Sequence, residues 1–367
     1  MRKLIEILIT VIWLMAAAIA HPASANHHEA PDFIDAQYSE AVVLFATMDN
    51  VSDWWTGFVE PAYREEWTAR FGWSEEDQKW VDRYTEYRNR TYVDPTQGLD
   101  MGTSPDGLFA SSSAASEATD PLATYMVGKR DIDAALEGFE AFASPTDAEM
   151  LRGFYRHFEP KWRALLSESK AVSQQAAMLQ QDFNTERVRP FLDAVAAFYK
   201  VEDIGTFEIF FTRMPSGARI RAELIAGNVL ILHAPENLSY DAIGWDEIVA
   251  HEIVHHISAR QDATSKRAMT NRFLAICPLT RKSRRLWVLE EPLAVSIGQA
   301  AYSEMVLGQE LDPRSNWYAN PWIDISARLI ARRVIGALQK GVALEDTQIV
   351  EEAADRCATL TFISENM

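Results

Sequence analysis

The spacing of apolar residues changes once along this chain, near Asp203, and that change restricts the fold more than any other feature. From about 31 to 201, apolar and aromatic residues recur with the period of amphipathic helices. Three short runs rich in β-branched and aromatic residues follow, at 207–212, 219–225 and 229–232. The pattern predicts an α+β protein, mostly helical, with a small antiparallel sheet.

Turn residues separate the three predicted strands. Pro215-Ser216-Gly217 and Gly227-Asn228 stand between them, and such residues are typical of the turns in an antiparallel meander. Amphipathic patterns at about 186–199 and 245–260 predict a helix on each side of the strands. The expected order is therefore helix, three strands, helix.

Three segments follow from these patterns: a leader at 1–25, a helical region at 26–200 and a domain of strands and helices at 201–367. Within the helical region, the stretch 94–120 is rich in Pro, Gly, Asp and Ser, which predicts a mobile insertion. Tryptophans in this region have helical spacing, which favours packing between helices over stacking on carbohydrate. These tryptophans are Trp54, Trp55, Trp67, Trp73, Trp80 and Trp162.

The leader has the three parts of a signal peptide. Arg2 and Lys3 precede an apolar run at 7–20, and Ala23-Ser24-Ala25 supplies the small residues before a cleavage site. We expect cleavage after Ala25 and a periplasmic or secreted protein without a stable membrane span; an uncleaved anchor is the alternative.

The formal net charge of −18 repels phosphates and argues against nucleic-acid binding.

The chain has two cysteines, Cys277 and Cys357. In an exported protein they can form one disulfide, which would connect the segment after the 245–260 helix to the C-terminal helix. The alternative is a pair of buried free thiols.

The predicted helix at 245–260 carries the strongest functional signal. It contains His251-Glu252-Ile253-Val254-His255, an HExxH motif. Residues four apart share one face of a helix, so the two imidazoles can bind one Zn²⁺ while Glu252 reaches a water beside it. His256 is expected to be a neighbour of the site and not a ligand, because it points about 100° away from His255 around the helix.

This motif resembles that of the zincin metallopeptidases. The metzincin branch is excluded because Ser258 and Gln261 stand where its motif has Gly and His. The gluzincin branch takes its third ligand, a Glu, from a later helix, and the stretch Glu291-Pro292-Leu293-Ala294 matches that pattern with Pro in place of Gly. The resemblance, which covers about 201–310, therefore implies Glu291 as third ligand on a helix from about 291 to 307, with Glu290 as the alternative.

The resemblance also implies a zincin-like fold with two metal-bearing helices, one Zn²⁺ ion, and a peptide or protein substrate. Glu252 would be the general base that takes a proton from a zinc-activated water. In this family an edge strand before the HExxH helix pairs with extended substrate, and 228–234 matches that place. An Asp that orients a zinc-bound His in familiar members is replaced here by Val295.

Two roles stay unassigned at this point. Ser296, or the pair Asp246 and Glu247, could take over the orienting hydrogen bond to a ligand His. The donor that stabilises the oxyanion has three candidates by position, which are Tyr302, Tyr318 and His233.

Three functions fit the sequence. The first is a zinc metallopeptidase, and the second is a zincin-fold protein that uses its metal for structure or recognition, with the helical region as a partner-binding module. The third is a zinc hydrolase of non-peptide amides. The intact Glu252 favours hydrolysis, because a structural metal site needs no base.

Overall fold

The computed structural model of the 367-residue chain describes residues 33–55, 59–93, 120–168, 172–216, 218, 220–235, 237–277, 289–312 and 314–366. The chain divides into 1–32 and 33–367. The expected signal peptide and all but the last residue of the expected insertion lie outside the described residues.

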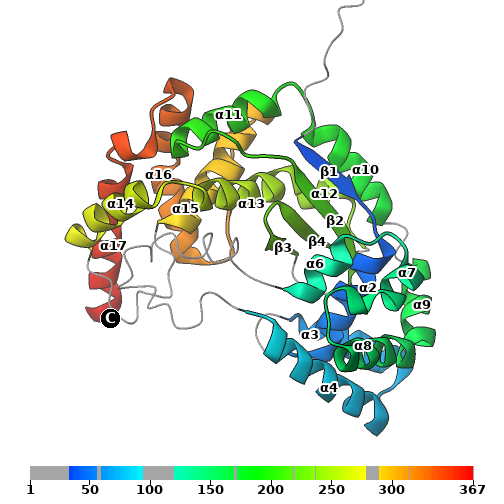
Figure 1. The fold of residues 1–367 in the computed structure, drawn as a ribbon. Helices are drawn as coiled ribbons and strands as arrows, with labels where there is room; N and C mark the ends of the chain where they lie inside the picture. Colours follow the sequence, from blue (N-terminus) through cyan, green and yellow to red (C-terminus); the bar gives the residue numbers. More distant parts are fainter. Residues whose placement is uncertain are drawn as a thin grey trace, which may run out of the picture. The chain divides into compact units, whose positions relative to one another are not determined.

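Most of the described chain is helical, in agreement with the sequence pattern (Figure 1). The helices before the sheet segment are α2 (Glu40–Ser52), α3 (Pro61–Phe71), α4 (Glu75–Thr91), α6 (Pro121–Val127), α7 (Ile132–Glu137), α8 (Pro145–His157), α9 (Glu159–Glu168), α10 (Val172–Phe183) and α11 (Val188–Tyr199). The helices after it are α12 (Tyr240–Ile243), α13 (Trp245–Ala259), α14 (Ala263–Ile276), α15 (Glu290–Val295), the π-helical η4 (Ser296–Ala301) and η5 (Ser303–Leu307), α16 (Pro321–Lys340) and α17 (Ile349–Asn366).

The described residues contain one four-stranded sheet, with strand order β1-β2-β4-β3. The strands are β1 (Ile34–Gln37), β2 (Phe207–Met214), β3 (Arg221–Ala226) and β4 (Val229–Pro235). β2 pairs in parallel with both β1 and β4, and only β3 and β4 form an antiparallel pair, joined by the turn at Gly227 and Asn228.

The expected antiparallel meander is therefore wrong, although the three expected strands are present. Instead of pairing with its neighbour in sequence, β2 lies inside the sheet between β1 and β4. A strand covered on both faces is apolar along its whole length, and seven of the eight β2 residues are buried. β1 could not be predicted from the sequence, because it has four residues and only Ile34 is both large and apolar.

Two hydrophobic cores lie on the two faces of this sheet. Phe207, Ile209 and Phe211 of β2 belong to one core, while Phe210 and Met214 belong to the other. This alternation follows from the period of two along a strand. The first core is completed by α10, α11, α13 and the helix at 290–307, and the second by the helices from α2 to α9.

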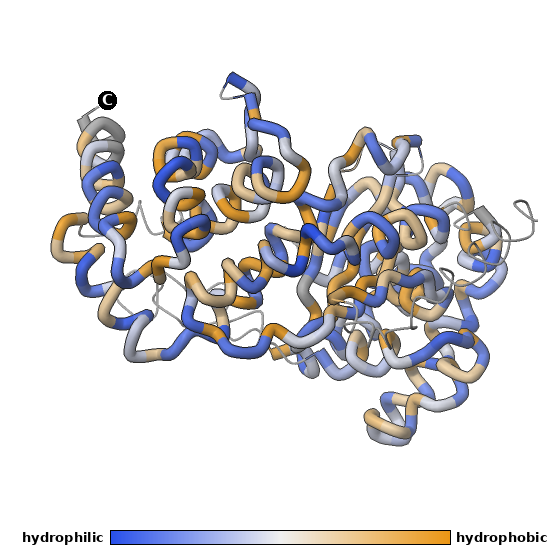
Figure 2. Tube along the Cα trace, turned by 90° about the horizontal axis from the view of Figure 1, so that it is seen from above, coloured by the Kyte–Doolittle hydropathy of each residue, from blue (hydrophilic) through white to orange (hydrophobic). Residues whose placement is uncertain are grey.

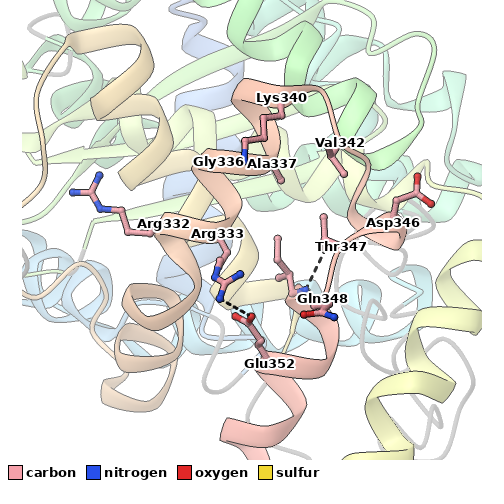
Figure 3. A pocket seen from close by; sticks show the side chains of 11 residues that line it. Arg332, Arg333, Gly336, Ala337, Lys340, Val342, Asp346, Thr347, Gln348 and Glu352 are labelled. Atoms are coloured by element: carbon pink, nitrogen blue, oxygen red, sulfur yellow. Dashed lines mark hydrogen bonds and ion pairs between the residues drawn. The ribbon is translucent and has the colours of Figure 1, made fainter.

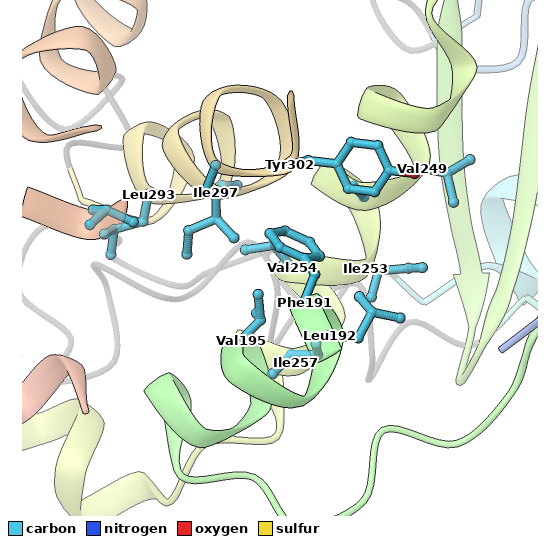
Figure 4. Close-up of a cluster of buried hydrophobic side chains, with 14 of the residues drawn as sticks. Phe191, Leu192, Val195, Val249, Ile253, Val254, Ile257, Leu293, Ile297 and Tyr302 are labelled. Carbon is cyan, nitrogen blue, oxygen red and sulfur yellow. The ribbon is translucent and has the colours of Figure 1, made fainter. Parts of the chain in front are cut away.

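Side chains from α11, α13 and the 290–307 helix interlock in the first core. Figure 4 shows Leu192 and Val195 of α11 next to Ile253 and Ile257 of α13. Figure 2 shows hydrophobic and hydrophilic residues alternating along the helices, as expected where one face of each helix packs inward. α13 is thus held between the sheet, α11 and the helix that follows the 278–288 segment.

The second core encloses a buried ion cluster. Arg88 is 1 % exposed and makes two hydrogen bonds of 2.6 Å to the carboxylate of Asp120. Its Nε lies 2.8 Å from Asp49 Oδ1, and the Asp49 carboxylate also accepts hydrogen bonds from Trp54 and Tyr84. The cluster joins α2, α4 and the first turn of α6. Trp67 and Trp162 are also buried in this layer, in agreement with the predicted packing role.

Asp77 forms a second polar cluster at the start of α4. It makes a reciprocal capping box with Ser74, and its carboxylate accepts hydrogen bonds from Lys161 at 2.9 Å and from His157 at 2.7 Å. Burial raises the pKa of Asp77, but the hydrogen bonds from Lys161, Ser74 and His157 outweigh it and lower the pKa to about 2.

A disulfide joins Cys277, the C-cap of α14, to Cys357 in α17, with a Cα–Cα distance of 5.9 Å. The pairing agrees with the sequence prediction and excludes the two free thiols. It fixes the chain just before the segment that leads to α15. Among the described helices, none combines the length and apolar character needed to cross a bilayer.

Candidate metal centre

The HExxH motif lies in the middle of α13, as expected. The helix begins at Trp245, directly after Gly244 in the left-handed conformation (φ 71°), and it is apolar on the faces that contact the sheet and α11. His251 and His255, one turn apart, project from its remaining face toward α15. Their Nε2 atoms are 3.1 Å apart.

Glu291 completes the group from the first turn of α15. Its two carboxylate oxygens lie 3.3 Å from His251 Nε2 and 3.2 Å from His255 Nε2. The ligand atoms of these three residues all lie within 4.8 Å of one another, and this is the one such group of His, Cys, Asp and Glu side chains in the described part of the chain. The structure thus brings together His251, His255 and Glu291, the three residues expected to bind metal.

The helix at 290–307 lies unusually close to α13. A Cβ atom on Gly298 would lie 2.3 Å from the Cα and 2.8 Å from the Cβ of His251, so no larger residue fits there without movement. The same stretch is π-helical, and such turns occur frequently at functional sites. The glycine allows α13 and the helix at 290–307 to approach until Glu291 reaches both imidazoles.

Glu290 has a different role from its neighbour. It is 2 % exposed, and its Oε1 lies 3.0 Å from Nδ1 of His255, on the opposite side of the ring from Glu291. The expected alternative, Glu290 as the third ligand, does not match this placement. Two consecutive carboxylates instead hold one imidazole between them.

The residues expected to orient a ligand His are engaged elsewhere. Ser296 donates to the carbonyl oxygens of Pro292 and Ala327. Asp246 accepts from Tyr240 at 2.7 Å, and Glu247 accepts from Ser303 at 3.2 Å. Instead, the carboxylate of Glu290, predicted only as an alternative ligand, lies at the second ring nitrogen of His255.

The charges around His251, His255 and Glu291 favour binding of a cation. Burial by itself lowers the pKa of His255, but the carboxylates of Glu291 and Glu290 outweigh it and raise the pKa well above its ordinary value. Burial raises the pKa of Glu291, and the two imidazoles lower it well below the usual range. Two buried carboxylates beside two imidazoles thus stabilise positive charge, and two nitrogens with one carboxylate oxygen are a donor set that suits Zn²⁺.

Glu252 lies beside this group without joining it. Burial raises the pKa of its carboxyl group, and the charge of Glu291 adds to that effect, while His251 and His255 act in the opposite direction. Within the described residues its carboxylate makes no hydrogen bond to protein. Glu252 therefore has the free oxygens and the raised pKa expected of a general base.

Tyr318 covers the group from the loop between η5 and α16. Its ring stacks on His251 with centroids 6.1 Å apart and planes 21° apart. Burial raises the pKa of Tyr318, as do the charge of Glu291 and a hydrogen bond to its carboxylate. Asp324, which is 2 % exposed, holds the loop in place by accepting the backbone N–H of Trp317 at 2.7 Å and of Tyr318 at 3.2 Å.

The other two candidates for an oxyanion donor lie elsewhere. Tyr302 is fully buried in the first core, where it stacks on Phe183 with centroids 5.8 Å apart. His233 lies on the opposite face of the sheet from α13, where Nδ1 lies 3.0 Å from the Tyr63 hydroxyl and Nε2 lies 3.4 Å from Glu223. The structure thus brings only Tyr318 to the metal group.

The strand expected to border the cleft is not an edge strand. β4, which contains most of the expected segment 228–234, lies between β2 and β3, and the edge on that side is β3. The correction follows from the hairpin at Gly227 and Asn228, which folds β3 back along the outer side of β4. β3 contacts α13, and no further strand lies on its outer side within the described sheet.

A pocket of about 330 Å³ lies away from this group, between α16 and the start of α17 (Figure 3). It is lined by Arg332, Arg333 and Lys340 together with apolar residues that include Ile349. Arg333 pairs with Glu352 across it at 3.2 Å. It contains none of the metal-site residues, so it has no part in the chemistry considered below.

Comparison with protein-family models, with curated proteins and with solved structures finds no match to this chain. The functional argument therefore depends on the geometry of the site.

Proposed function

We propose that this chain is a zinc-dependent hydrolase of peptide bonds. The observation that carries the proposal is the convergence of His251, His255 and Glu291, from two helices, beside a carboxylate that takes no part in the group. The three ligands would leave a fourth position for water or substrate. The resemblance to gluzincins rests on the same residues.

A zinc ion held by His251, His255 and Glu291 would supply Lewis-acid chemistry, which polarises a carbonyl and activates water near neutral pH. The chain's own residues do the rest. The Glu252 carboxylate accepts a proton from the attacking water and returns it to the leaving amine nitrogen. Its raised pKa suits both steps, because the group must be ionised first and protonated afterwards.

Tyr318 is the hydroxyl donor that this site can offer to the developing oxyanion. Its hydroxyl already lies within hydrogen-bond reach of Glu291, and stacking on His251 holds its ring. Asp324 keeps its backbone in place. A donor held in this way loses little freedom when the oxyanion forms.

We further propose that an extended peptide pairs with β3. β3 is the last strand on its side of the described sheet, so a substrate strand can be added beside it, next to α13. Substituting Ala222 and Glu223, one on each face of β3, should change cleavage preference in a peptide-library digest. A cleavage preference that is the same as that of the wild type in both variants would contradict this pairing.

A metal held only for structure is the competing function, and the burial of His251 and Glu291 favours it. Such a site has no need of a base, however, and Glu252 offers a carboxylate free of protein hydrogen bonds within the described chain. The Glu252→Gln variant separates the two functions. We expect it to keep stoichiometric zinc and lose hydrolysis. Glu247→Gln, on the same helix, is the control and should keep both.

The decisive experiment combines metal analysis of the purified protein with digestion of a peptide library. One bound zinc per chain, cleavage abolished by a chelator and cleavage restored by Zn²⁺ would support the proposal. Zinc bound without cleavage by the wild type would favour the structural role, and no bound metal would reject both functions.

We also propose that the protein is exported and works in an oxidising compartment. The disulfide between Cys277 and Cys357 supports this location, because such bonds persist mainly outside the cytosol. The leader at 1–25 has the composition of a signal peptide. N-terminal sequencing of the exported protein tests the expected cleavage after Ala25.

A further inference from the structure

We propose that Glu290 is a positioning residue that sets the tautomer and orientation of His255 for metal binding. The inference rests on the metal site of the proposed function and deepens it. It assigns a role to the first member of the Glu290-Glu291 pair, a role that the spacing of the motif does not indicate.

The first argument is the geometry around one ring. Glu290 Oε1 lies 3.0 Å from Nδ1 of His255, while Glu291 Oε2 lies 3.2 Å from Nε2 of the same residue. A carboxylate at Nδ1 retains the proton there, which leaves the Nε2 lone pair free to bind a metal. The two consecutive carboxylates therefore have separate tasks: one binds the ion and the other prepares a ligand.

The second argument is the difference between the two imidazoles. Within the described residues, Nδ1 of His251 is buried and has no hydrogen-bond partner. Its ring is held instead by stacking on Tyr318 and by the close approach of Gly298 to its backbone. His255 is thus the one ligand imidazole that a carboxylate orients through its distal nitrogen.

The third argument is that the other candidates for orienting a ligand imidazole make their contacts elsewhere. Val295, which replaces the orienting Asp of familiar gluzincins, packs against Ile323 and Ala327. The hydrogen bonds of Ser296, Asp246 and Glu247 go to groups other than the imidazoles. In this chain the carboxylate at a ligand imidazole therefore comes from the residue directly before the ligand Glu.

The experiment measures Zn²⁺ and Co²⁺ affinity by competition with a chromophoric chelator for the wild type, Glu290→Ala and Glu290→Gln. Loss of an orienting partner typically weakens metal binding by about 10- to 100-fold, and we expect that loss for Glu290→Ala. Glu290→Gln retains an oxygen that can accept from Nδ1, so its loss should be smaller. Glu247→Gln, whose carboxylate accepts from Ser303, is the matched control and should bind metal as the wild type does.

A second readout distinguishes positioning from general structural damage. Long-range ¹H–¹⁵N spectra of histidine-labelled, zinc-loaded protein report which ring nitrogen of His255 carries the proton. We expect Nδ1–H in the wild type and a changed Nδ1 signal in Glu290→Ala, with the other imidazoles unaffected.

Wild-type affinity in both Glu290 variants would overturn the inference and leave the proposed function intact. Weaker binding with an unchanged His255 signal would also overturn it, because the effect would then be structural. If the wild type itself binds no metal, the inference and the proposed function fail together. If Glu290→Ala does not fold, Glu290→Gln is compared with Glu247→Gln: weaker metal binding with a changed His255 Nδ1 signal supports the inference, and wild-type values of both overturn it.

Discussion

Replacing Gly298 by alanine should disrupt the metal centre without touching a ligand. The added Cβ would lie 2.3 Å from the Cα, 2.4 Å from the backbone N and 2.8 Å from the Cβ of His251. Carbon atoms that pack well are about 3.5–4.0 Å apart, so α13 and η4 must separate locally by roughly 1 Å. Backbone atoms cannot yield as the end of a flexible side chain can.

The size of the effect follows from that displacement. Overpacking of a core typically costs about 1–3 kcal/mol in the free energy of unfolding. Metal–ligand distances tolerate only about 0.2 Å, so a shift of His251 away from Glu291 should weaken zinc binding as well. A misplacement of about 1 Å can cost roughly 100-fold in rate, and we expect a loss of that order in kcat/KM.

Urea unfolding in excess chelator gives the packing cost alone, and chelator competition gives the metal affinity. Gly336→Ala is the matched control, because Gly336 is also in a helix but a Cβ there has no neighbour within 4 Å. We expect that control to keep its metal affinity and to gain up to about 1 kcal/mol, since alanine favours helix over glycine. A Gly298→Ala protein with wild-type stability and zinc affinity would refute the close-approach argument.

Three further predictions concern other parts of the molecule. Asp77 has a folded-state pKa of about 2 against an ordinary value of 3.8. Its contribution of about 2 kcal/mol to the free energy of unfolding is therefore present above pH 4 and lost as the pH falls to 2. Urea unfolding at a series of acid pH values should show the stability difference between the wild type and Asp77→Asn shrinking over that range. Arg88→Met should lower the free energy of unfolding in urea by about 3–5 kcal/mol, because it leaves the carboxylates of Asp49 and Asp120 without their cation. Arg90→Met, which breaks the half-exposed pair with Asp147, should cost less than about 1 kcal/mol. Similar costs for the two variants would contradict the role of the ion cluster. Tyr318→Phe should keep zinc and lower kcat by about 100-fold, measured by steady-state kinetics, and an unchanged kcat would exclude its hydroxyl from oxyanion stabilisation.

The elements that could be predicted from the sequence are those with local signals. The helices at 188–199 and 245–259 lie within two residues of the predicted bounds, because each has an apolar face of helical period. The helix beginning at Glu290 ends before Gly308, as expected, with its left-handed C-cap (φ 69°). The turn at Gly227 and Asn228 was predicted from its residue types, and Gly227 has the positive φ (56°) that glycine tolerates.

What could not be predicted depends on neighbours far away in the sequence. β1 carries too few apolar residues to be recognised, and its pairing with β2 is specified by a partner more than 150 positions later. The position of β3 at the sheet edge depends on β2 already occupying the other side of β4. Local turn residues are compatible with either arrangement, so the meander was the natural but wrong expectation.

The sequence by itself determined that His251 and His255 can bind one metal ion together, because a spacing of four on one helix places them on one face whatever the rest of the fold does. The tertiary structure alone decided the separate role of Glu290. The resemblance to gluzincins favoured Glu291 over Glu290 as the third ligand, but it indicated no contact between Glu290 and an imidazole. Only the approach of α15 to α13, permitted at Gly298, directs the Glu291 carboxylate to the Nε2 atoms of both imidazoles and the Glu290 carboxylate to Nδ1 of His255. Side-chain roles of this kind depend on distances between separate helices, and such distances are set by packing and not by local periodicity.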